Sequence, residues 1–258
     1  MDIITIIILI SSGILVGIVN TYAAGGVIIS TSVLVAFGMP ITVALGTNRI
    51  CIFLQNLVST IEFRRQKLIN LKAAFRLFVP MGIGSIFGAM FANICPEALL
   101  TLLFTLGGLF SLVMVFGKKS VMERANDGLN RRPTIRHNII LLLIGLYAGS
   151  IYVGVGYMML AIFMFGLGYD IIRANALKAF SALILSTVAI IPFIIHDNIN
   201  YTFGFVHAIG NMIGAYMASR HATALGVKYI RWIMVIMIVV SLTNMLYKQG
   251  VFTLLKNL

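Results

Sequence analysis

The sequence predicts an all-α polytopic membrane protein made of two inverted repeats, each with about five hydrophobic segments that include short broken or re-entrant helices. Three observations predict this class. Of the 258 residues, 60% are hydrophobic and only 10% are charged, which leaves no room for a separate soluble domain. Long apolar segments alternate with short polar stretches. The two halves also match weakly when the second is laid on the first with Gly168 on Gly38.

The first repeat occupies residues 1–117 and begins with an apolar segment over 3–24. This segment lacks the basic start of a signal peptide, so we expect it to enter the membrane. After Gly25-Gly26, residues 27–38 are too short to span, because a spanning helix needs about 20 residues. A half-helix or re-entrant segment is therefore expected there. The remaining segments of this repeat cover 40–61, 73–93 and 98–116.

The loop at 118–137 is basic, and the second repeat follows at 138–258. The repeat rests on glycines and polar residues that recur in phase rather than on any single match. The register that lays Gly168 on Gly38 also lays Gly214 on Gly84 and Ile199-Asn200 on Ile69-Asn70. Upstream, a change of two residues in the shift pairs Gly13 and Gly17 with Gly145 and Gly149. Gly84-xxx-Gly88 is a small-residue face on which helices can approach closely.

Lys and Arg set the expected topology. The loops at 64–76 and 118–136 are basic and therefore predicted to be cytoplasmic, whereas the turn at 93–97 lacks basic residues. In the second half the bias changes sides, since 196–200 has no Lys or Arg and 220–231 is basic. This swap predicts inversion. We expect a multi-pass protein of the cell (inner or plasma) membrane, and topology accounts for the net charge of +12 without nucleic acid as a partner.

A charged residue, Arg49, falls inside the third apolar segment, in the stretch Ala44-Leu45-Gly46-Thr47-Asn48-Arg49. A charge at membrane depth costs about 2.5–3.5 kcal/mol on insertion scales, so a partner must offset it. The second half places Asn175 and Lys178 at the matching position, and neither motif contains an acidic residue. We therefore predict an anion site between Arg49 and Lys178. Amides and the helix N-termini near Pro40 and Asp170 would add donors and positive dipole ends.

The predicted substrate-binding residues are polar side chains of the two motifs, together with Gln55 on the same segment as Arg49 and Tyr22 at the first break. They are Thr47, Asn48, Arg49, Asn175, Lys178, Tyr22 and Gln55. Three of them have a structural alternative. Arg49 would bond to backbone carbonyls at the break near Gly25-Gly26, Lys178 would extend to the membrane interface, and Gln55 would join helices. An isolated His207 in such a helix is more often a hydrogen-bonded structural residue than a proton relay.

These motifs resemble the sulfite exporter TauE/SafE family over roughly residues 10–250. The third element of each repeat carries the resemblance, together with the spans Gly84-Ser85-Ile86-Phe87-Gly88 and Gly214-Ala215-Tyr216-Met217-Ala218. The chain departs from the glycine-rich breaks of the family at Tyr22 and at Tyr157-Met158. The resemblance implies transport of sulfur-containing or organic anions.

The predicted function is a secondary transporter that moves a small anion of sulfite, organosulfonate or carboxylate type through a midplane site between the repeats. A passive anion channel and a membrane-embedded lipid-modifying enzyme are the alternatives. The expected partners are the anion and the lipid bilayer, with a coupling proton or sodium ion and a homo-oligomer left open. Cys51 and Cys95 form no metal motif, and we expect no cofactor, metal, catalytic residue or enzymatic activity.

Overall fold

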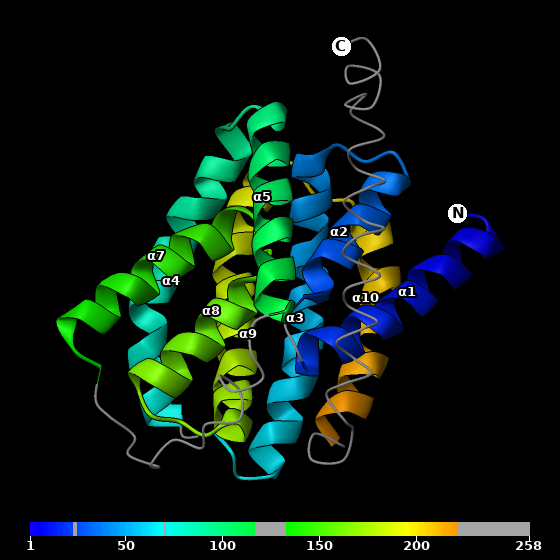
Figure 1. The fold of residues 1–258 in the computed structure, drawn as a ribbon. Coiled ribbons are helices and arrows are strands. Elements are labelled where there is room, and N and C mark those ends of the chain that lie inside the picture. The colour runs from blue at the N-terminus through cyan, green and yellow to red at the C-terminus, as the bar shows by residue number, and fades with distance from the viewer. Residues whose placement is uncertain (23–24, 70, 117–132, 221–258) are drawn as a thin grey trace.

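The computed structural model describes residues 1–22, 25–69, 71–116 and 133–220, and these residues are helical apart from turns and breaks (Figure 1). The elements are α1 (Ile3–Tyr22), α2 (Gly26–Ala36), α3 (Ile41–Arg65), α4 (Leu71–Ile94), α5 (Glu97–Phe116), α7 (Ile135–Ser150), α8 (Val155–Ala161), the π-helical turn η1 (Ile162–Gly166), α9 (Ile171–Ile195) and α10 (Tyr201–Arg220).

The described helices confirm the predicted all-α membrane architecture. Four helical stretches among them are long and apolar enough to cross a bilayer, namely α1, α3, Ala74–Ile94 of α4, and α9. On α4 the large side chains of Val79, Ile83 and Phe87, spaced four residues apart, are all exposed. An exposed apolar stripe at this spacing suits lipid rather than water. Most of the central loop and the expected last segment of the second half lie outside the described residues.

Two long helices, α3 and α9, form the centre of the molecule. Each has 25 residues. In Figure 1, α3 runs downward from blue to cyan, whereas α9 runs upward from yellow-green to yellow. The two central helices are therefore antiparallel, as an inverted repeat requires.

Backbone conformation recurs in the predicted register. Gly38 and Gly168 both have positive φ, at 90° and 79°, just before the two central helices. Lys67 and Asp197, which match in the same register, have φ of 57° and 52° just after them. A positive φ is uncommon for residues other than glycine. Two pairs of positive φ at the same spacing of 130 residues support the inverted repeat.

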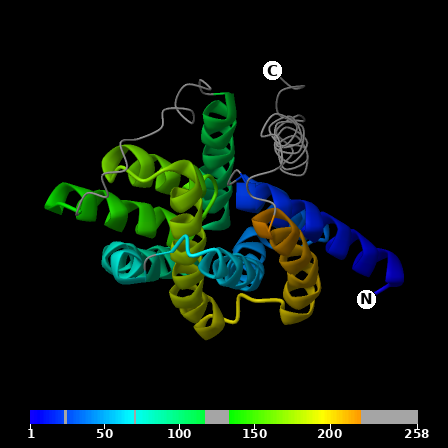
Figure 2. The same ribbon diagram turned by 90° about the horizontal axis from the view of Figure 1, so that it is seen from below.

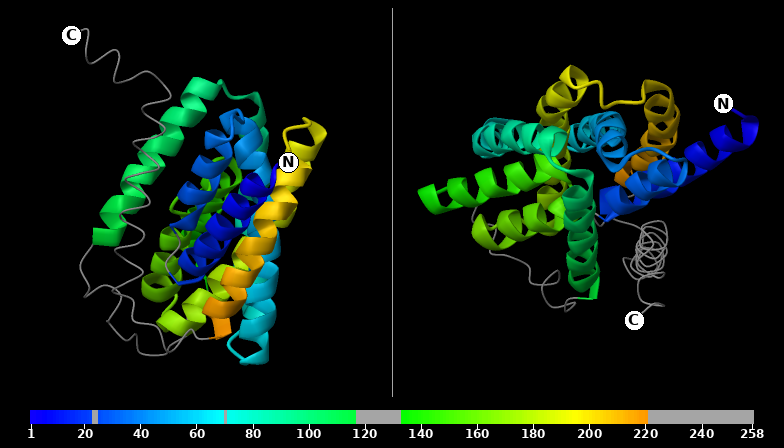
Figure 3. Two further views of the ribbon diagram at one scale, coloured as in Figure 1. Left: turned by 90° about the vertical axis from the view of Figure 1, so that its right-hand side faces the viewer. Right: turned by 90° about the horizontal axis from the view of Figure 1, so that it is seen from above.

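The flanking helices pack across the two halves. α1 packs against α10, and α4 packs against α7. Figure 2 shows these pairs on opposite flanks of α3 and α9, and the left panel of Figure 3 shows α1 beside α10. Each half therefore completes its packing with helices of the other half.

Glycines let these outer pairs approach closely, as predicted for Gly84 and Gly88. A Cβ on Gly84 would collide with the carbonyl oxygen of Leu142 on α7. Correspondingly, a Cβ on Gly214 would collide with the carbonyl oxygen of Ile14 on α1. Close backbone approach through small residues is a common way for membrane helices to associate, because dispersion contacts rather than the hydrophobic effect hold them together.

The same contacts correct the predicted register of the first helix of each repeat. Gly17 packs against the carbonyl oxygen of Asn211, and Gly145 packs against that of Met81. Met81 and Asn211 match in the register that lays Gly168 on Gly38, so their partners Gly145 and Gly17 occupy matching places. The expectation that Gly17 pairs with Gly149 is wrong, because the shift in this helix is two residues shorter than in the rest of the repeat rather than two longer.

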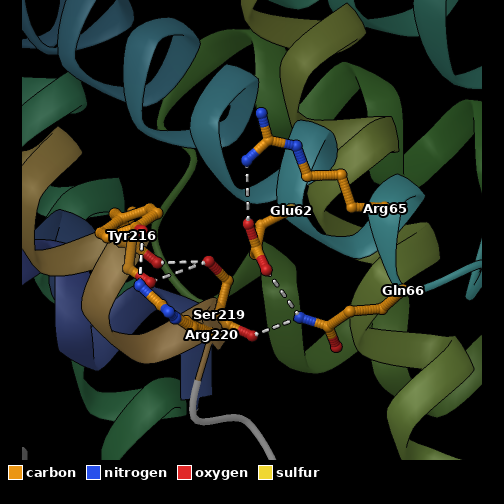
Figure 4. Close-up of polar contacts among 7 residues, drawn as sticks. Glu62, Arg65, Gln66, Tyr216, Ser219 and Arg220 are labelled. Atoms are coloured by element: carbon orange, nitrogen blue, oxygen red, sulfur yellow. Dashed lines mark hydrogen bonds and ion pairs between the residues drawn. The ribbon is translucent and has the colours of Figure 1, made fainter.

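Contacts between loops separate the two ends of the bundle. Asn198 donates through Nδ2 to Oδ1 of Asn93 at 2.8 Å, which joins the two turns that lack basic residues. At the opposite end Gln66 donates to the carbonyl oxygen of Ser219 at 3.1 Å, beside Arg220 (Figure 4). The described parts of the basic segments, after α3 and at the end of α10, thus lie at the same end of the bundle. This agrees with the prediction that the basic loop takes a different position in the second half than in the first.

Candidate functional site

Two helices, α1 and α7, end inside the protein and are followed by shorter helices that turn back (Figure 1). The last carbonyl groups of a helix have no partner within it. α7 closes tightly, since the N–H groups of Ile151 and Tyr152 both donate to the carbonyl oxygen of Tyr147, at 3.0 and 3.3 Å. Tyr152 then has φ of 67° and Gly154 has φ of 74°. We call 23–25 the first break and 151–154 the second break.

Arg49 on α3 binds the end of α7 at the second break. Its side chain is buried, with 1% exposed. Nη1 donates to Ala148 O at 2.7 Å, and Nη2 donates to Gly149 O at 2.6 Å and to Ser150 O at 3.3 Å. A cation is favourable here because a helix carries partial negative charge at its C-terminus.

Lys178 on α9 binds the end of α1 at the first break. It is also buried, with 5% exposed. Its Nζ donates to Asn20 O at 3.0 Å and to Thr21 O at 3.2 Å. The ammonium group has three donors, and carbonyl oxygens occupy two of them.

Each cation therefore caps a broken helix that belongs to the other half of the chain. The expectation that Lys178 extends to the membrane interface is wrong, because its ammonium group binds buried carbonyl groups. The alternative that Arg49 binds backbone carbonyls is correct in kind, but the break is the second one and not Gly25-Gly26. Sequence spacing places a cation near a break without saying which break it meets.

The two cations lie at different depths. The Phe193 ring centroid lies 5.5 Å from Cζ of Arg49, whereas Phe63 packs with Ala176 and Ala179 beside Lys178. At the first break, Asn20 bonds to Gln55, which lies six residues (55 minus 49) after Arg49 on α3, or about 9 Å along a helix axis. Arg49 and Lys178 bind the carbonyl groups of different breaks, so each break is considered as a site of its own.

Comparison with known proteins agrees with this membrane architecture. The model of the family "Sulfite exporter TauE/SafE" matches residues 9–245. The chain belongs to the TauE/SafE family. It is similar to a probable membrane transporter protein, ORF9, of Sinorhizobium sp., with 26% identity over 85% of this chain and 84% of that protein.

Two further relatives carry similar names. A probable membrane transporter protein of Haemophilus influenzae is 23% identical over 93% of this chain and 94% of its own length. The probable membrane transporter protein YfcA of Escherichia coli is 26% identical over 90% and 86%. No solved structure matches the chain at a significant level. This TauE/SafE-family protein is therefore a multi-pass membrane transporter, and its relatives are named as transporters rather than enzymes.

The first break of this transporter carries a polar cluster. Asn20 donates through Nδ2 to Oε1 of Gln55 at 3.1 Å and accepts at Oδ1 from the N–H of Gly26 at 2.8 Å. The hydroxyl groups of Thr21 and Ser59 lie 3.5 Å apart. Gln55 thus joins α3 to α1 at the first break, and partly buried Tyr22 ends α1 there. Sequence reasoning missed Asn20, although an amide in an apolar helix two residues before its end is a readable signal.

Two other predicted residues hold neighbouring helices. Thr47 Oγ1 accepts from the N–H of Asn200 at 2.9 Å, in the loop before α10. The amide of Asn48 contacts the hydroxyl groups of Ser30 and Thr31 on α2, at 2.6 and 3.2 Å. Thr47 and Asn48 are therefore used in contacts between helices. Arg49 follows them directly in the chain but binds a different element, the end of α7.

Asn175 lies one helical turn before Lys178 on α9. Its Oδ1 is buried and has no hydrogen-bond partner. Buried polar atoms are usually paired, so an unpaired one calls for an explanation. Residues three apart share a helix face, which places this free acceptor beside the Lys178 side chain.

The predicted positive helix ends near Pro40 and Asp170 lie away from the breaks. Pro40 and Asp170 are the N-caps of α3 and α9 and therefore mark the outer ends of these long helices. The Asp170 carboxylate already accepts from the N–H groups of Ile172 and Arg173, at 3.1 and 2.9 Å. The helix N-termini that follow the breaks are those of α2, which begins at Gly26, and of the short α8, which begins at Val155.

Proposed function

We propose that this protein is a secondary transporter that moves a small anion of the sulfite, organosulfonate or carboxylate type. The single observation that carries the proposal is the environment of Lys178. Its ammonium group is buried, its partners are two neutral carbonyl oxygens, and no ion pair joins it to any described carboxylate. A buried cation without a carboxylate is a fitting partner for an anion.

The first break offers the rest of an anion site. Lys178 has a third donor beyond its two carbonyl bonds. Gln55 and Tyr22 lie at the same break, and α2 presents its N-terminus there. Such N-termini carry partial positive charge and free N–H groups, which favour anions. Asn175 lies one helical turn from Lys178 and would serve a protonated or hydroxylated part of the substrate, since its free atom is an acceptor.

Arg49 caps the second break as Lys178 caps the first, but it has a different task on this proposal. Three carbonyl oxygens and two aromatic rings surround its guanidinium group. Arg49 holds the end of α7 at the second break, whereas Thr47 and Asn48 bind the loop before α10 and the helix α2. Broken helices in paired halves are typical of secondary transporters, in which one half moves against the other around the site.

The test is anion counterflow in proteoliposomes with radiolabelled sulfite, sulfoacetate and acetate. We expect exchange of at least one of these anions, and we expect Lys178→Gln to lower it at least tenfold. Arg173→Gln is the matched control, because this cation on the same helix is half exposed and pairs with Asp170 at 3.5 Å. Full exchange by Lys178→Gln would refute the site.

Gradients distinguish a transporter from a channel in the same vesicles. A secondary transporter accumulates labelled anion against its concentration gradient when a pH or sodium gradient is imposed. It also exchanges labelled for unlabelled anion faster than it carries out net transport. Purely downhill flux, insensitive to both gradients, would support the passive channel instead. A thermal shift gives an independent reading, since an anion that binds the folded state raises its Tm in the natural protein but not in Lys178→Gln.

A further inference from the structure

A buried polar chain joins four helices at a distance from Lys178. His207 of α10 is fully buried, and its Nδ1 lies 2.8 Å from Leu9 O on α1. Its Nε2 lies 2.9 Å from Oγ of Ser30 on α2. Ser30 Oγ in turn lies 2.6 Å from Oδ1 of Asn48 on α3, and Nδ2 of that amide donates to Thr31 at 3.2 Å.

Counting the hydrogens in this chain gives an unusual result. Leu9 O can only accept, so Nδ1 of His207 carries a hydrogen. In a neutral imidazole Nε2 is then an acceptor. Ser30 has a single hydroxyl hydrogen, yet two acceptors face it, Nε2 of His207 and Oδ1 of Asn48. One of the two contacts therefore lacks a hydrogen when His207 is neutral and the Asn48 amide stays as placed.

Two arrangements satisfy every contact, and they differ by one proton. In the first, His207 is an imidazolium that donates from Nε2 to Ser30, and Ser30 donates to Oδ1 of Asn48. In the second, His207 is neutral, Ser30 donates to Nε2, and the Asn48 amide is turned over. Its Nδ2 then donates to Ser30, and its Oδ1 accepts from the hydroxyl group of Thr31. The gain of one proton thus reverses the Ser30 hydroxyl group and the Asn48 amide.

No described carboxylate lies beside this chain. α2 has no titratable residue, and α1 has only Tyr22, at the opposite end of the helix from Leu9. On α3, Cys51 donates to Gly204 O at 3.4 Å and Arg49 is bound to α7, while Glu62, Arg64 and Arg65 lie in its last turn. α10 itself carries Tyr201, Tyr216 and Arg220 toward its ends. His207 is the titratable group in contact with the chain.

We propose that His207 is the proton-binding site through which a proton gradient drives anion movement. This inference rests on the proposed anion transport. Ser30 belongs to α2, the helix that starts at the first break, and Asn48 precedes Arg49, which holds the second break. Protonation of His207 therefore changes the hydrogen bonds that join α10 to α2 and α2 to α3, and these last two helices reach the first and the second break respectively. A proton carried with a monoanion makes the transported pair electrically neutral, which removes the cost of moving a bare charge through the membrane.

Imidazole ¹⁵N NMR of the full-length protein in nanodiscs tests the proton site without any substrate. The chain has four histidines, and His207→Gln identifies the signal of interest. We expect this signal to change from the neutral form protonated at Nδ1 to imidazolium as the pH is lowered, and at a lower pH than for an exposed histidine, because burial disfavours the charged form. A signal that stays neutral throughout the range in which the protein remains folded would overturn the proposal.

Transport then tests the coupling. Gln at position 207 can donate to Leu9 O and accept from Ser30 while taking up no proton, so it mimics neutral histidine. We expect His207→Gln to lose accumulation of labelled sulfite driven by a pH gradient at least tenfold while retaining sulfite counterflow. His196→Gln is the matched control, since this exposed histidine binds only Pro192 O of its own helix, at 2.8 Å. Accumulation equal to that of the natural protein would overturn the coupling.

Ser30→Ala provides a second variant if His207→Gln fails to fold. It keeps the imidazole but removes the relay hydroxyl group, so the titration should move to lower pH and pH-driven accumulation should fall. An unchanged titration in Ser30→Ala would refute the relay. Failure of the natural protein to exchange any of the tested anions would refute the proposed function instead, while the NMR titration would still decide whether His207 binds a proton.

Discussion

Each break lies between a longer helix and a shorter one, but the two breaks differ in what surrounds them. At the first break, Asn20, Gln55 and Ser59 form a polar cluster around the end of α1. The matching places at the second break hold apolar residues, namely Ala148, Leu185 and Ala189. The cations differ as well, since Lys178 has two carbonyl partners whereas Arg49 has three, with the rings of Tyr152 and Phe193 beside it.

This difference indicates a division of labour between the halves. The guanidinium group of Arg49 is held at its two terminal nitrogens by three hydrogen bonds and lies beside two rings, although its buried Nε has no partner. A lysine ammonium group with an unused donor can take a further ligand. The first break is therefore suited to bind and release an anion, and the second break is suited to keep α7 in place.

The largest expected effect is on the second break. Arg49→Ala leaves the last carbonyl groups of α7 buried without partners, so we expect a loss of about 3–5 kcal/mol in the free energy of unfolding. Reversible unfolding in lipid bicelles would measure it. Lys178→Ala should lose less, about 1–3 kcal/mol, since two carbonyl groups are freed. Equal losses in the two variants would contradict the division of labour.

An intermediate effect is expected when the first break is made to resemble the second. Gln55→Leu installs the residue found at the matching position, Leu185, and removes the partner of Asn20. We expect roughly a tenfold loss of apparent anion affinity in counterflow, equivalent to about 1.4 kcal/mol, because one buried hydrogen bond is lost. Leu54→Ile, on the same helix and only partly buried, serves as the control. Unchanged affinity in Gln55→Leu would move the site away from the first break.

The smallest effect concerns two phenylalanines at matching positions. Phe193 lies 5.5 Å from Arg49, whereas Phe63 packs against Ala176 and Ala179. Phe→Leu at either position loses packing, but only Phe193→Leu also loses a cation–π contact of about 0.5–1 kcal/mol. The difference between the two unfolding free energies measures that contact. No difference would show that the ring of Phe193 contributes through packing alone.

Much of the fold could be predicted because its signals are local. Apolar length sets α1, α3, α4 and α9, and the short segment before Gly38 marks α2. The burial of Arg49 and Lys178 follows from apolar neighbours on both sides. The close approach at Gly84 follows from spacing, since glycines four residues apart share a helix face.

The partners of the cations could not be predicted, because they depend on register and depth. Gly13 and Gly17 have the same spacing as Gly145 and Gly149, so an offset of one helical turn fits the sequence equally well. Only the contact of Gly145 with Met81 decides between them. The distance in depth between Arg49 and Lys178 depends likewise on how far α3 slides along α9, which no single sequence motif encodes.

The crosswise capping of the breaks also has a consequence for biosynthesis. The carbonyl group of Thr21 binds the ammonium group of Lys178, a residue that the ribosome adds 157 residues later. In contrast, Arg49 has already been synthesised when the end of α7 leaves the ribosome. The first half therefore enters the membrane with an uncapped helix end, and its own completion depends on the arrival of the second half. If the first half were synthesised alone, we would expect the end of α1 to bind Lys178 of another chain.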